Sequence, residues 1–345
     1  MRRVLAATLV TVAILSTMAW AASDRPTAIE YGSREAGIGA VLGRGLDARN
    51  TPSAVAVTSD GAVWFRESFT WHPRVARFGP DGSFREFWDP FFDLRGWYRP
   101  GGMIVDDRGA FTADGDGVVL GPVRGGGADT FVTRMGPDGS LRRRAAAGCT
   151  VAGNRTTIMM RTFVCFASPR AVPPALPNAN WATRGPRGDV WFTDAEHSLI
   201  GRVRPDGTQT IFTRGLTRWH SGPQFITTGP DGNMWFTEIR DRVGRITQDG
   251  RITEFSRGIP HRASLGGIIA GRDGNLWFTL YHGMVLGKIT VNGAVTLYHD
   301  LVYPSDGHDF DPVAMIVRDR EGRLYYNEGQ AGRIARVTIS TKVAR

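Results

Sequence analysis

A short motif recurs along the chain at nearly constant spacing and constrains the fold more than any other feature. The three clearest copies share a turn glycine followed by Trp-Phe-Thr and span Gly185–Asp194, Gly229–Glu238 and Gly271–Leu280. Their tryptophans are 44 and then 42 residues apart. Four short strands repeating at such a period are typical of the blades of a β-propeller. The repeat therefore predicts an all-β chain built of four-stranded blades.

The copy around Trp235 shows how one unit is divided. It predicts four strands, Phe225–Thr228, Met234–Glu238, Val243–Thr247 and Arg251–Phe255, with Asp-Gly turns after the first and the third. Asp-Gly is a dipeptide that suits tight hairpin turns. A basic residue five positions before the second turn glycine, Arg245 in this copy, forms a second landmark that recurs through the chain.

The number of blades depends on one stretch that lacks the motif. Weaker copies run over Ser59–Glu67 and Asp319–Glu328, and a worn copy begins at Asp107, with Gly115 flanked by Asp114 and Asp116. The 80 residues from Phe111 to Trp191 amount to two periods, so residues 146–178 are expected to form a degenerate third blade with strands at Thr156–Met160 and Thr162–Phe166. This count predicts seven blades, and six blades with a long insertion remain the alternative.

The two ends of the chain indicate export and ring closure. Arg2 and Arg3 precede an uncharged run from Val4 to Ala22, and Ala19-Trp20-Ala21 resembles a signal peptidase site. We expect a signal peptide over residues 1–21 and a single propeller domain over 26–345, secreted or periplasmic. An uncleaved membrane anchor is the alternative. Thr27–Tyr31 resembles an outermost strand, and its pairing with the last strand would close the ring.

The charge and the cysteine content limit the kinds of binding partner that the sequence predicts. The formal charge is +9, but the basic residues are scattered, with Arg142–Arg144 as the one run. Nucleic acid binding requires clustered cations and is not expected. We expect a monomer that binds a small molecule or a peptide and has no membrane contact after cleavage of the signal peptide. The two cysteines, Cys149 and Cys165, suit a disulfide in an exported protein, with free thiols as the alternative.

Acidic residues recur six positions after the turn glycines, where the second strand of a blade ends. The first strand begins at the same face, so these side chains are expected to lie around the centre of that face. Carboxylates gathered in this way need a cation or nearby basic groups, and oxygen ligands favour Mg²⁺ or Ca²⁺. We predict metal ligands at Glu328, Asp311 and Glu238, and ligand-facing residues at Glu67, Asp194, Asn180, Gln224, Trp181 and Trp219. The alternative is that the acids pair with backbone N–H groups or arginines.

Histidines in the connecting loops supply candidate bases. His220 and His308 precede the prolines that begin first strands, and His282 and His197 follow the acidic position. A histidine beside a metal-held carboxylate is suited to general base catalysis near neutral pH. We select His308, His220 and His282 as the candidate catalytic group, with a solvated surface role as the alternative.

The repeat resembles that of the virginiamycin B lyase family. The similarity covers most of the chain after the signal peptide and is strongest from Asn180 to Tyr298. The resemblance implies a seven-bladed propeller that opens a cyclic depsipeptide antibiotic by elimination, with Mg²⁺ and a histidine that follows the proline of a first strand. The corresponding positions in this sequence contain no histidine; they are Ser53, Gly101, Asn180, Gln224, Gly266 and Val313. Glu328 and Asp311 retain acids where the family has them.

Two functions of different classes follow from these observations. The first is a metal-assisted lyase or lactone hydrolase acting on a cyclic ester, with Mg²⁺, or Ca²⁺ as the alternative. The second is a non-catalytic propeller that binds a peptide or glycan through loop aromatics such as Trp181 and Trp219. A divalent ion with a histidine beside it would distinguish the first from the second.

Overall fold

The computed structural model is all-β in the part of the chain that it describes. The described residues are 27–31, 51–68, 74–88, 112–124, 131–145, 149–152, 162–165, 179–217, 222–280, 285–299, 315–328 and 333–338, and they contain no helix. No helix in these ranges is therefore long and apolar enough to cross a membrane. The proposed signal peptide, residues 1–21, lies outside them.

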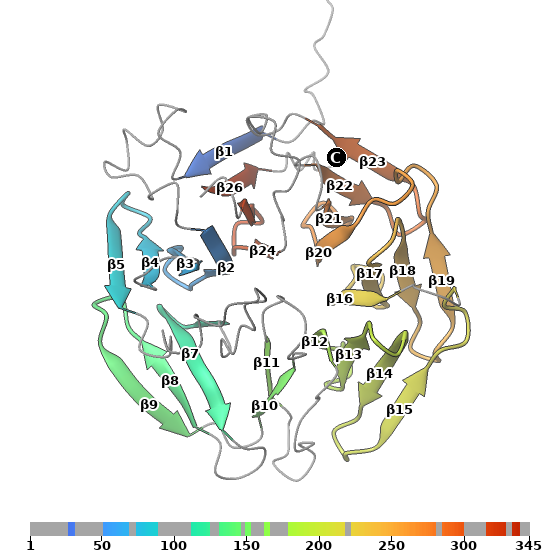
Figure 1. Ribbon diagram of the computed structural model, residues 1–345, viewed down its shortest axis with the longest axis horizontal. Coiled ribbons are helices and arrows are strands. Elements are labelled where there is room, and N and C mark those ends of the chain that lie inside the picture. Colours follow the sequence, from blue (N-terminus) through green and yellow to red (C-terminus); the bar gives the residue numbers. More distant parts are fainter. Residues whose placement is uncertain are drawn as a thin grey trace, which may run out of the picture.

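The strands form antiparallel sheets arranged around a common centre, as in a β-propeller (Figure 1). In each of the four-stranded sheets, sequence neighbours pair in order from the centre outward, apart from the last sheet, whose order is β1-β26-β25-β24. The first two four-stranded sheets in the described ranges are β2 (Thr51–Val57), β3 (Val63–Ser68), β4 (Arg74–Phe78) and β5 (Phe84–Trp88), and then β6 (Thr112–Asp114), β7 (Gly117–Arg124), β8 (Phe131–Met135) and β9 (Leu141–Ala145).

Three further four-stranded sheets contain the clearest repeats. They are β12 (Trp181–Arg184), β13 (Val190–Asp194), β14 (Leu199–Val203) and β15 (Gln209–Phe212); β16 (Pro223–Thr228), β17 (Met234–Glu238), β18 (Val243–Ile246) and β19 (Ile252–Phe255); and β20 (Leu265–Ala270), β21 (Leu276–Leu280), β22 (Leu286–Ile289) and β23 (Val295–Tyr298). The last sheet consists of β24 (Ile316–Arg318), β25 (Leu324–Glu328), β26 (Arg333–Thr338) and β1 (Thr27–Tyr31).

The predicted strands of the clearest repeat are confirmed. β17 has the predicted bounds, β16 begins two residues earlier than predicted, and β18 and β19 each differ by one residue at one end. The Trp-Phe-Thr motif forms the second strand, which is buried along its whole length. A bulky second strand requires a small residue opposite, and a Cβ at Gly244 would lie 2.0 Å from the ring of Phe236. The glycine of the third strand is therefore dictated by the phenylalanine of the second.

The basic landmark of the repeat is part of an aromatic stack. The ring of Trp235 stacks on Phe255 of the outermost strand at a centroid distance of 5.4 Å, and the Arg245 guanidinium lies 5.6 Å from the Trp235 centroid. Cations over aromatic faces are stabilising. Corresponding stacks recur in three other sheets, formed by Trp64 with Phe87 and Arg77, Trp191 with Phe212 and Arg202, and Trp277 with Tyr298 and Lys288.

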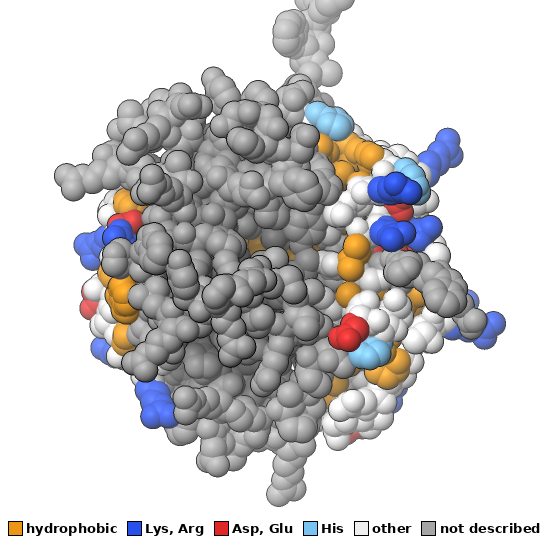
Figure 2. Space-filling model, in the orientation of Figure 1, with side chains coloured by type: hydrophobic (Ala, Val, Ile, Leu, Met, Phe, Trp, Pro, Cys, Tyr) orange, Lys and Arg blue, Asp and Glu red, His pale blue; other side chains and the backbone are white. Residues whose placement is uncertain are grey.

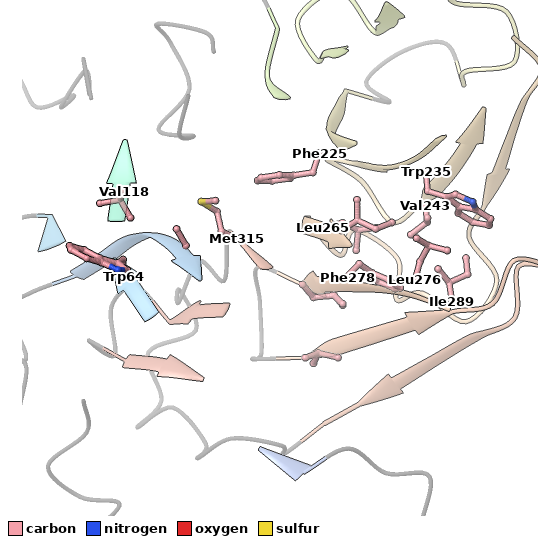
Figure 3. Close-up of a cluster of buried hydrophobic side chains, with 14 of the residues drawn as sticks. Trp64, Val118, Phe225, Trp235, Val243, Leu265, Leu276, Phe278, Ile289 and Met315 are labelled. Atoms are coloured by element: carbon pink, nitrogen blue, oxygen red, sulfur yellow. The ribbon is translucent and has the colours of Figure 1, made fainter. Parts of the chain in front are cut away.

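The threonine of the motif connects neighbouring sheets. Thr237 Oγ1 donates a 2.7 Å hydrogen bond to the carbonyl of Gly266 in the next sheet, and Thr193 donates to the carbonyl of Gln224. Apolar side chains fill the space between sheets: Figure 3 shows Trp235 and Val243 beside Leu276 and Ile289. The repeat thus encodes both the blade and its contact with the next one.

Strands from both ends of the chain share one sheet. β1 pairs antiparallel with β26, with Thr27 opposite Thr338 and Tyr31 opposite Ile334. The sequence resemblance of Thr27–Tyr31 to an outermost strand thus corresponds to its place at the outer edge of this sheet.

The prediction that Gly115 ends the second strand of the worn repeat was wrong, because this glycine follows the first strand. Gly115 lies at the turn between β6 and β7, with φ of +63°, so Asp114 and Asp116 do not end a second strand. Asp116 instead forms an ion pair with Arg134 of β8. The motif residues that fix the register are missing from this copy, which allowed the misalignment.

The degenerate segment contains a two-stranded sheet, β10 (Cys149–Ala152) and β11 (Thr162–Cys165), in the described part of the chain. The predicted strand Thr162–Phe166 is thereby confirmed to within one residue, and the predicted strand Thr156–Met160 lies outside the described residues.

We expect a disulfide between Cys149 and Cys165, because the β10–β11 register places these two positions directly opposite each other. Directly opposed residues of antiparallel strands have Cα atoms about 4.5–5.5 Å apart, within the range that a disulfide spans. Serine at both positions should lower the free energy of unfolding by about 3 kcal/mol, as for other loops of about 15 residues. Intact mass before and after reduction checks the bond, and two titratable thiols in the unreduced, unfolded protein would exclude it.

Candidate functional site

The candidate site lies at the face where the second strands end and the first strands begin. β13 ends at Asp194 and β17 ends at Glu238, and the loop from β15 to β16 returns to the same face. In Figure 2, histidines and acidic side chains lie beside one another on the described part of the face shown. The polar residues in and around these strand ends form three groups.

The first group is an Asp–His pair in the turn after β13. His197 Nδ1–H donates to Asp194 Oδ2 at 2.9 Å, and the His197 backbone N–H donates to Asp194 Oδ1 at 2.9 Å. The Asp194 side chain is only 7% exposed, whereas the His197 ring is 53% exposed. The hydrogen bond and the negative charge of Asp194 raise the pKa of His197 above its ordinary value. This geometry orients the ring and leaves Nε2 free to accept a proton.

A pocket of about 600 Å³ adjoins this pair. It is lined by His197, Ser198 and the segment Thr213–Thr217, which connects β15 to β16. Leu216 of this segment is buried between the two sheets, and Thr217 is tied to β19 by two hydrogen bonds to Glu254, from its backbone N at 2.6 Å and from Oγ1 at 2.5 Å. One wall of the pocket is therefore held by a residue of the neighbouring sheet.

The second group surrounds Glu238. Its side chain is fully buried beside the Glu254 carboxylate, with which it shares a side-chain hydrogen bond when it is protonated. Burial, together with the adjacent Glu254 carboxylate, raises the pKa of Glu238 to about 9. Arg242 Nε lies 3.7 Å from Glu254 Oε2 and partly offsets the charge of Glu254.

The third group joins two loops. His261 Nδ1–H donates to Asp241 Oδ2 at 2.8 Å, and the backbone N–H of Arg262 donates to the same oxygen at 3.0 Å. Asp241 also donates its backbone N–H to the carbonyl of Ala263. These hydrogen bonds connect the β17–β18 turn to the β19–β20 loop. The role of this Asp–His pair is therefore to hold the two loops together.

Three predicted ligand-facing residues are buried or pack between sheets. Asn180 Oδ1 accepts the backbone N–H of Ala195 at 2.6 Å, and its Nδ2 has no partner in the described ranges. Gln224 Oε1 is likewise buried without a partner there. Trp181 packs against Phe225, with 5.1 Å between ring centroids, so it contributes to packing between two sheets.

The other predicted residues lie outside the described residues or are described by their backbone alone. His308, His220, His282, Asp311 and Trp219 lie outside the described residues, and for Glu67 and Glu328 the structure gives backbone positions in β3 and β25. Within the described ranges, no three His, Cys, Asp or Glu side chains are close enough to hold a metal ion together. The Asp194 and Glu238 carboxylates each face groups of their own sheet or of an adjoining loop.

His197 stands near the acidic position in the sequence but was not among the predicted catalytic residues, and Asp241, Glu254 and His261 were not predicted. The three-residue spacing of Asp194 and His197 in one turn was the available signal. No comparable signal marks His261, which is 20 residues from Asp241, or Glu254, which lies in an outermost strand.

Comparison of the sequence with models of protein families shows to which family the chain is related. The sequence model of the virginiamycin B lyase family matches residues 131–345. The chain belongs to the virginiamycin B lyase family. No curated protein matches it.

Several solved structures of low sequence identity are similar to this member of the virginiamycin B lyase family. They include a streptogramin B lyase (19% identity, 91% of this chain and 98% of that chain covered, TM-score 0.45). A catalytically inactive virginiamycin B lyase from Staphylococcus aureus with quinupristin has 20% identity, coverage of 92% and 100%, and a TM-score of 0.46. The WD40 β-propeller domain of Doa1 has 9% identity, coverage of 84% and 93%, and a TM-score of 0.54. The last of these supports the propeller fold alone.

Proposed function

We propose that the protein is an exported propeller enzyme that opens a cyclic ester or lactone, with His197 as the base. The Asp194–His197 pair carries this proposal. A buried carboxylate orients the imidazole and makes it more basic, while its second nitrogen remains available beside a pocket. This is the arrangement that activates histidine bases in many enzymes.

His197 would replace the base that the family has after the first-strand proline. Its Nε2 would take the proton from the carbon next to a carbonyl, the electron pair would form a carbon–carbon double bond, and the ester C–O bond would break to release a carboxylate. Hydrolysis is the related reaction, in which Nε2 takes a proton from the attacking water. The hydroxyls of Ser198 and Thr213, which line the pocket, offer hydrogen bonds to such a substrate.

We further propose seven blades closed by the N-terminal strand, in a monomer that is secreted or periplasmic after loss of residues 1–21. The pairing of β1 with β26 and the two-stranded sheet β10–β11 between the second and fourth sheets support this count (Figure 1). Pairing of this kind fixes the N-terminal strand to the last blade and so joins the two ends of the chain in one sheet.

Mg²⁺ remains the proposed cofactor, with Ca²⁺ as the alternative. Glu238 is a proposed ligand because its buried carboxyl ends β17 beside the Glu254 carboxylate, and a cation there would allow both groups to ionise. Glu328 and Asp311 stay proposed ligands. Bound Mg²⁺ would polarise the ester carbonyl, and the role proposed for His197 does not depend on it.

Replacing His197 with Ala should lower kcat/KM for an identified cyclic ester by about 10²–10⁴-fold, the usual contribution of a general base. In the wild type, kcat/KM should fall at acidic pH with a midpoint above 6.5, because Asp194 raises the pKa of the free base. The measurement is turnover of cyclic depsipeptides and lactones by the protein lacking residues 1–21, with Mg²⁺ and with EDTA.

His261→Ala is the matched control, since it removes an equally paired histidine from the same face and should leave kcat/KM within a few fold. Turnover that His197→Ala leaves intact would contradict the role of this residue. Binding of peptides or glycans without any turnover would instead support a non-catalytic binding propeller, which the absence of the Pro-His pattern favours.

A further inference from the structure

The pocket beside His197 is lined by basic and neutral residues. Its wall includes His197 and Arg214 but no aspartate or glutamate. Arg214 is exposed and forms no ion pair with another residue in the described part of the chain. Of the two acids in the same turn as His197, Asp194 is buried and bound to the imidazole, and Glu196 lies outside the wall. The wall therefore carries an uncompensated positive charge.

Ser198, in the same wall, has an unfavourable backbone conformation. Its φ of +50° lies in the left-handed region, which residues with a side chain adopt rarely. The turn is held by Asp194, whose carboxylate accepts both the backbone N–H and the ring N–H of His197. Residues strained in this way are concentrated at binding and catalytic sites. Glycine would fit here without strain, and what serine adds to glycine is a hydroxyl at the pocket wall.

A corresponding loop in the next sheet shows which part of the segment is structural. Thr213–Leu216 follows β15, and Ser256–Ile259 follows β19 with the same order of hydroxyl, arginine, glycine and aliphatic residue. Both glycines have positive φ and both aliphatic residues are buried, whereas both arginines are exposed. Three residues after the end of the second strand, the first sheet has His197 and the next sheet has Asp241. The combination of an arginine with a histidine thus belongs to the first of these loops.

Opening of a cyclic ester produces a carboxylate close to the base. In the elimination, Nε2 of His197 takes a proton from carbon, the C–H electron pair forms the double bond, and the C–O electron pair leaves with the carboxylate. Hydrolysis converts the acyl carbon to the same group. Positive charge and hydrogen-bond donors placed where negative charge develops stabilise the transition state. Arginine is suited to this role, because its guanidinium can donate two parallel hydrogen bonds to one carboxylate.

We propose that Arg214 and the hydroxyls of Ser198 and Thr213 form a carboxylate-binding subsite, which receives the carboxylate released when the ring opens. The link to ring opening rests on the proposed function, whereas the binding of a carboxylate is measured without turnover. Arg214 supplies the charge, and the two hydroxyls donate to the remaining lone pairs. The subsite should hold a linear product more tightly than a ring, because the ring has an uncharged ester in place of the carboxylate.

The test is titration of N-acetylphenylalanine into the protein lacking residues 1–21, followed by calorimetry and by the shift in Tm, with its methyl ester as the uncharged comparison. The acid should bind at least about tenfold more tightly than the ester. Arg214→Gln should weaken binding of the acid about 10–100-fold, as expected for the loss of charge-assisted hydrogen bonds. Ser198→Gly should weaken binding a few fold and raise the Tm of the free protein, because it removes the hydroxyl and the backbone strain together.

Arg257→Gln is the matched control, since it removes an exposed arginine from the corresponding loop of the next sheet and should leave affinity unchanged. No binding of the acid by the wild type, equal affinity for acid and ester, or equal affinity of wild type and Arg214→Gln would overturn the proposal. Tighter binding of inorganic phosphate than of the acid would overturn the assignment to a carboxylate.

The subsite and the proposed function can fail separately. Carboxylate binding that Arg214→Gln abolishes, in a protein that turns over no cyclic ester, would support the subsite and contradict the proposed enzyme. Turnover that requires His197, in a protein whose affinity for the acid does not depend on Arg214, would support the enzyme and overturn the subsite.

Discussion

Glu238→Gln is expected to raise the free energy of unfolding of the metal-free protein by about 3 kcal/mol at pH 7. Burial raises the pKa of Glu238 to about 9 in the folded state, against 4.5 for an ordinary glutamate. The folded protein must therefore keep a proton at pH 7 that the unfolded chain releases. Gln is neutral at every pH, and its amide can donate to Glu254.

The sign follows from proton linkage. Below pH 4.5 both states hold the proton, and Glu238 does not make stability depend on pH. Between pH 4.5 and about 9 the unfolded state binds fewer protons than the folded state, so the stability of the wild type falls as pH rises. Above about 9 the loss is complete. The advantage of Glu238→Gln should accordingly grow from pH 5 to pH 9.

Urea unfolding in EDTA at pH 5, 7 and 9 measures this difference. Glu196→Gln, an exposed substitution of the same kind, should show no such trend. With saturating Mg²⁺ the advantage should shrink or reverse, because the proposed ion stabilises only protein that retains the carboxylate. Equal stability of wild type and Glu238→Gln at all three pH values in EDTA would show that Glu238 is solvated in the folded protein.

Trp235→Ala is expected to destabilise the protein by about 3–5 kcal/mol, the usual cost of removing a large buried aromatic side chain. Trp235 is fully buried, stacks on Phe255, lies beneath Arg245 and donates its Nε1–H to Asp231 Oδ1 at 2.9 Å. Its loss removes the centre of a blade and leaves Asp231 without this donor.

Trp235→Phe is the matched variant for comparison with Trp235→Ala. It keeps an aromatic ring in the stack but loses the hydrogen bond to Asp231 and part of the volume, so it should cost clearly less than Trp235→Ala. Thermal and urea unfolding give both values. A Trp235→Ala variant within about 1 kcal/mol of wild type would mean that the stack contributes little, contrary to what its burial implies.

The departure from the family's Pro-His pattern bears directly on function. Asn180 and Gln224 are buried amides where histidines would follow the proline, and each retains one polar atom without a partner in the described ranges. Amides at these positions can orient a ligand but cannot serve as bases near neutral pH. Catalysis, if it follows the family's chemistry, requires a base from elsewhere, and Asp194–His197 is the described pair with a free ring nitrogen beside a pocket.

Much of the fold was predictable because the repeat carries its own register. The Trp-Phe-Thr motif, the turn glycines and the basic landmark identified the strands of the sheet β16–β19 to within two residues. The same reasoning misplaced the worn copy, because no tryptophan marks its second strand. Gly115 was assigned to the end of that strand but lies in the turn that precedes it. Local pattern is informative where side chains repeat and fails where they have diverged.

Sequence alone determined the class of fold and the four-stranded repeat unit, because strand periodicity and turn glycines act over a few neighbouring residues. Only the tertiary structure decided which polar groups meet. Glu238 lies against Glu254, Asp241 against His261 and Thr217 against Glu254, and each contact joins segments 16 or more residues apart. Such contacts depend on how strands and sheets pack on one another, and they leave no spacing pattern along the chain.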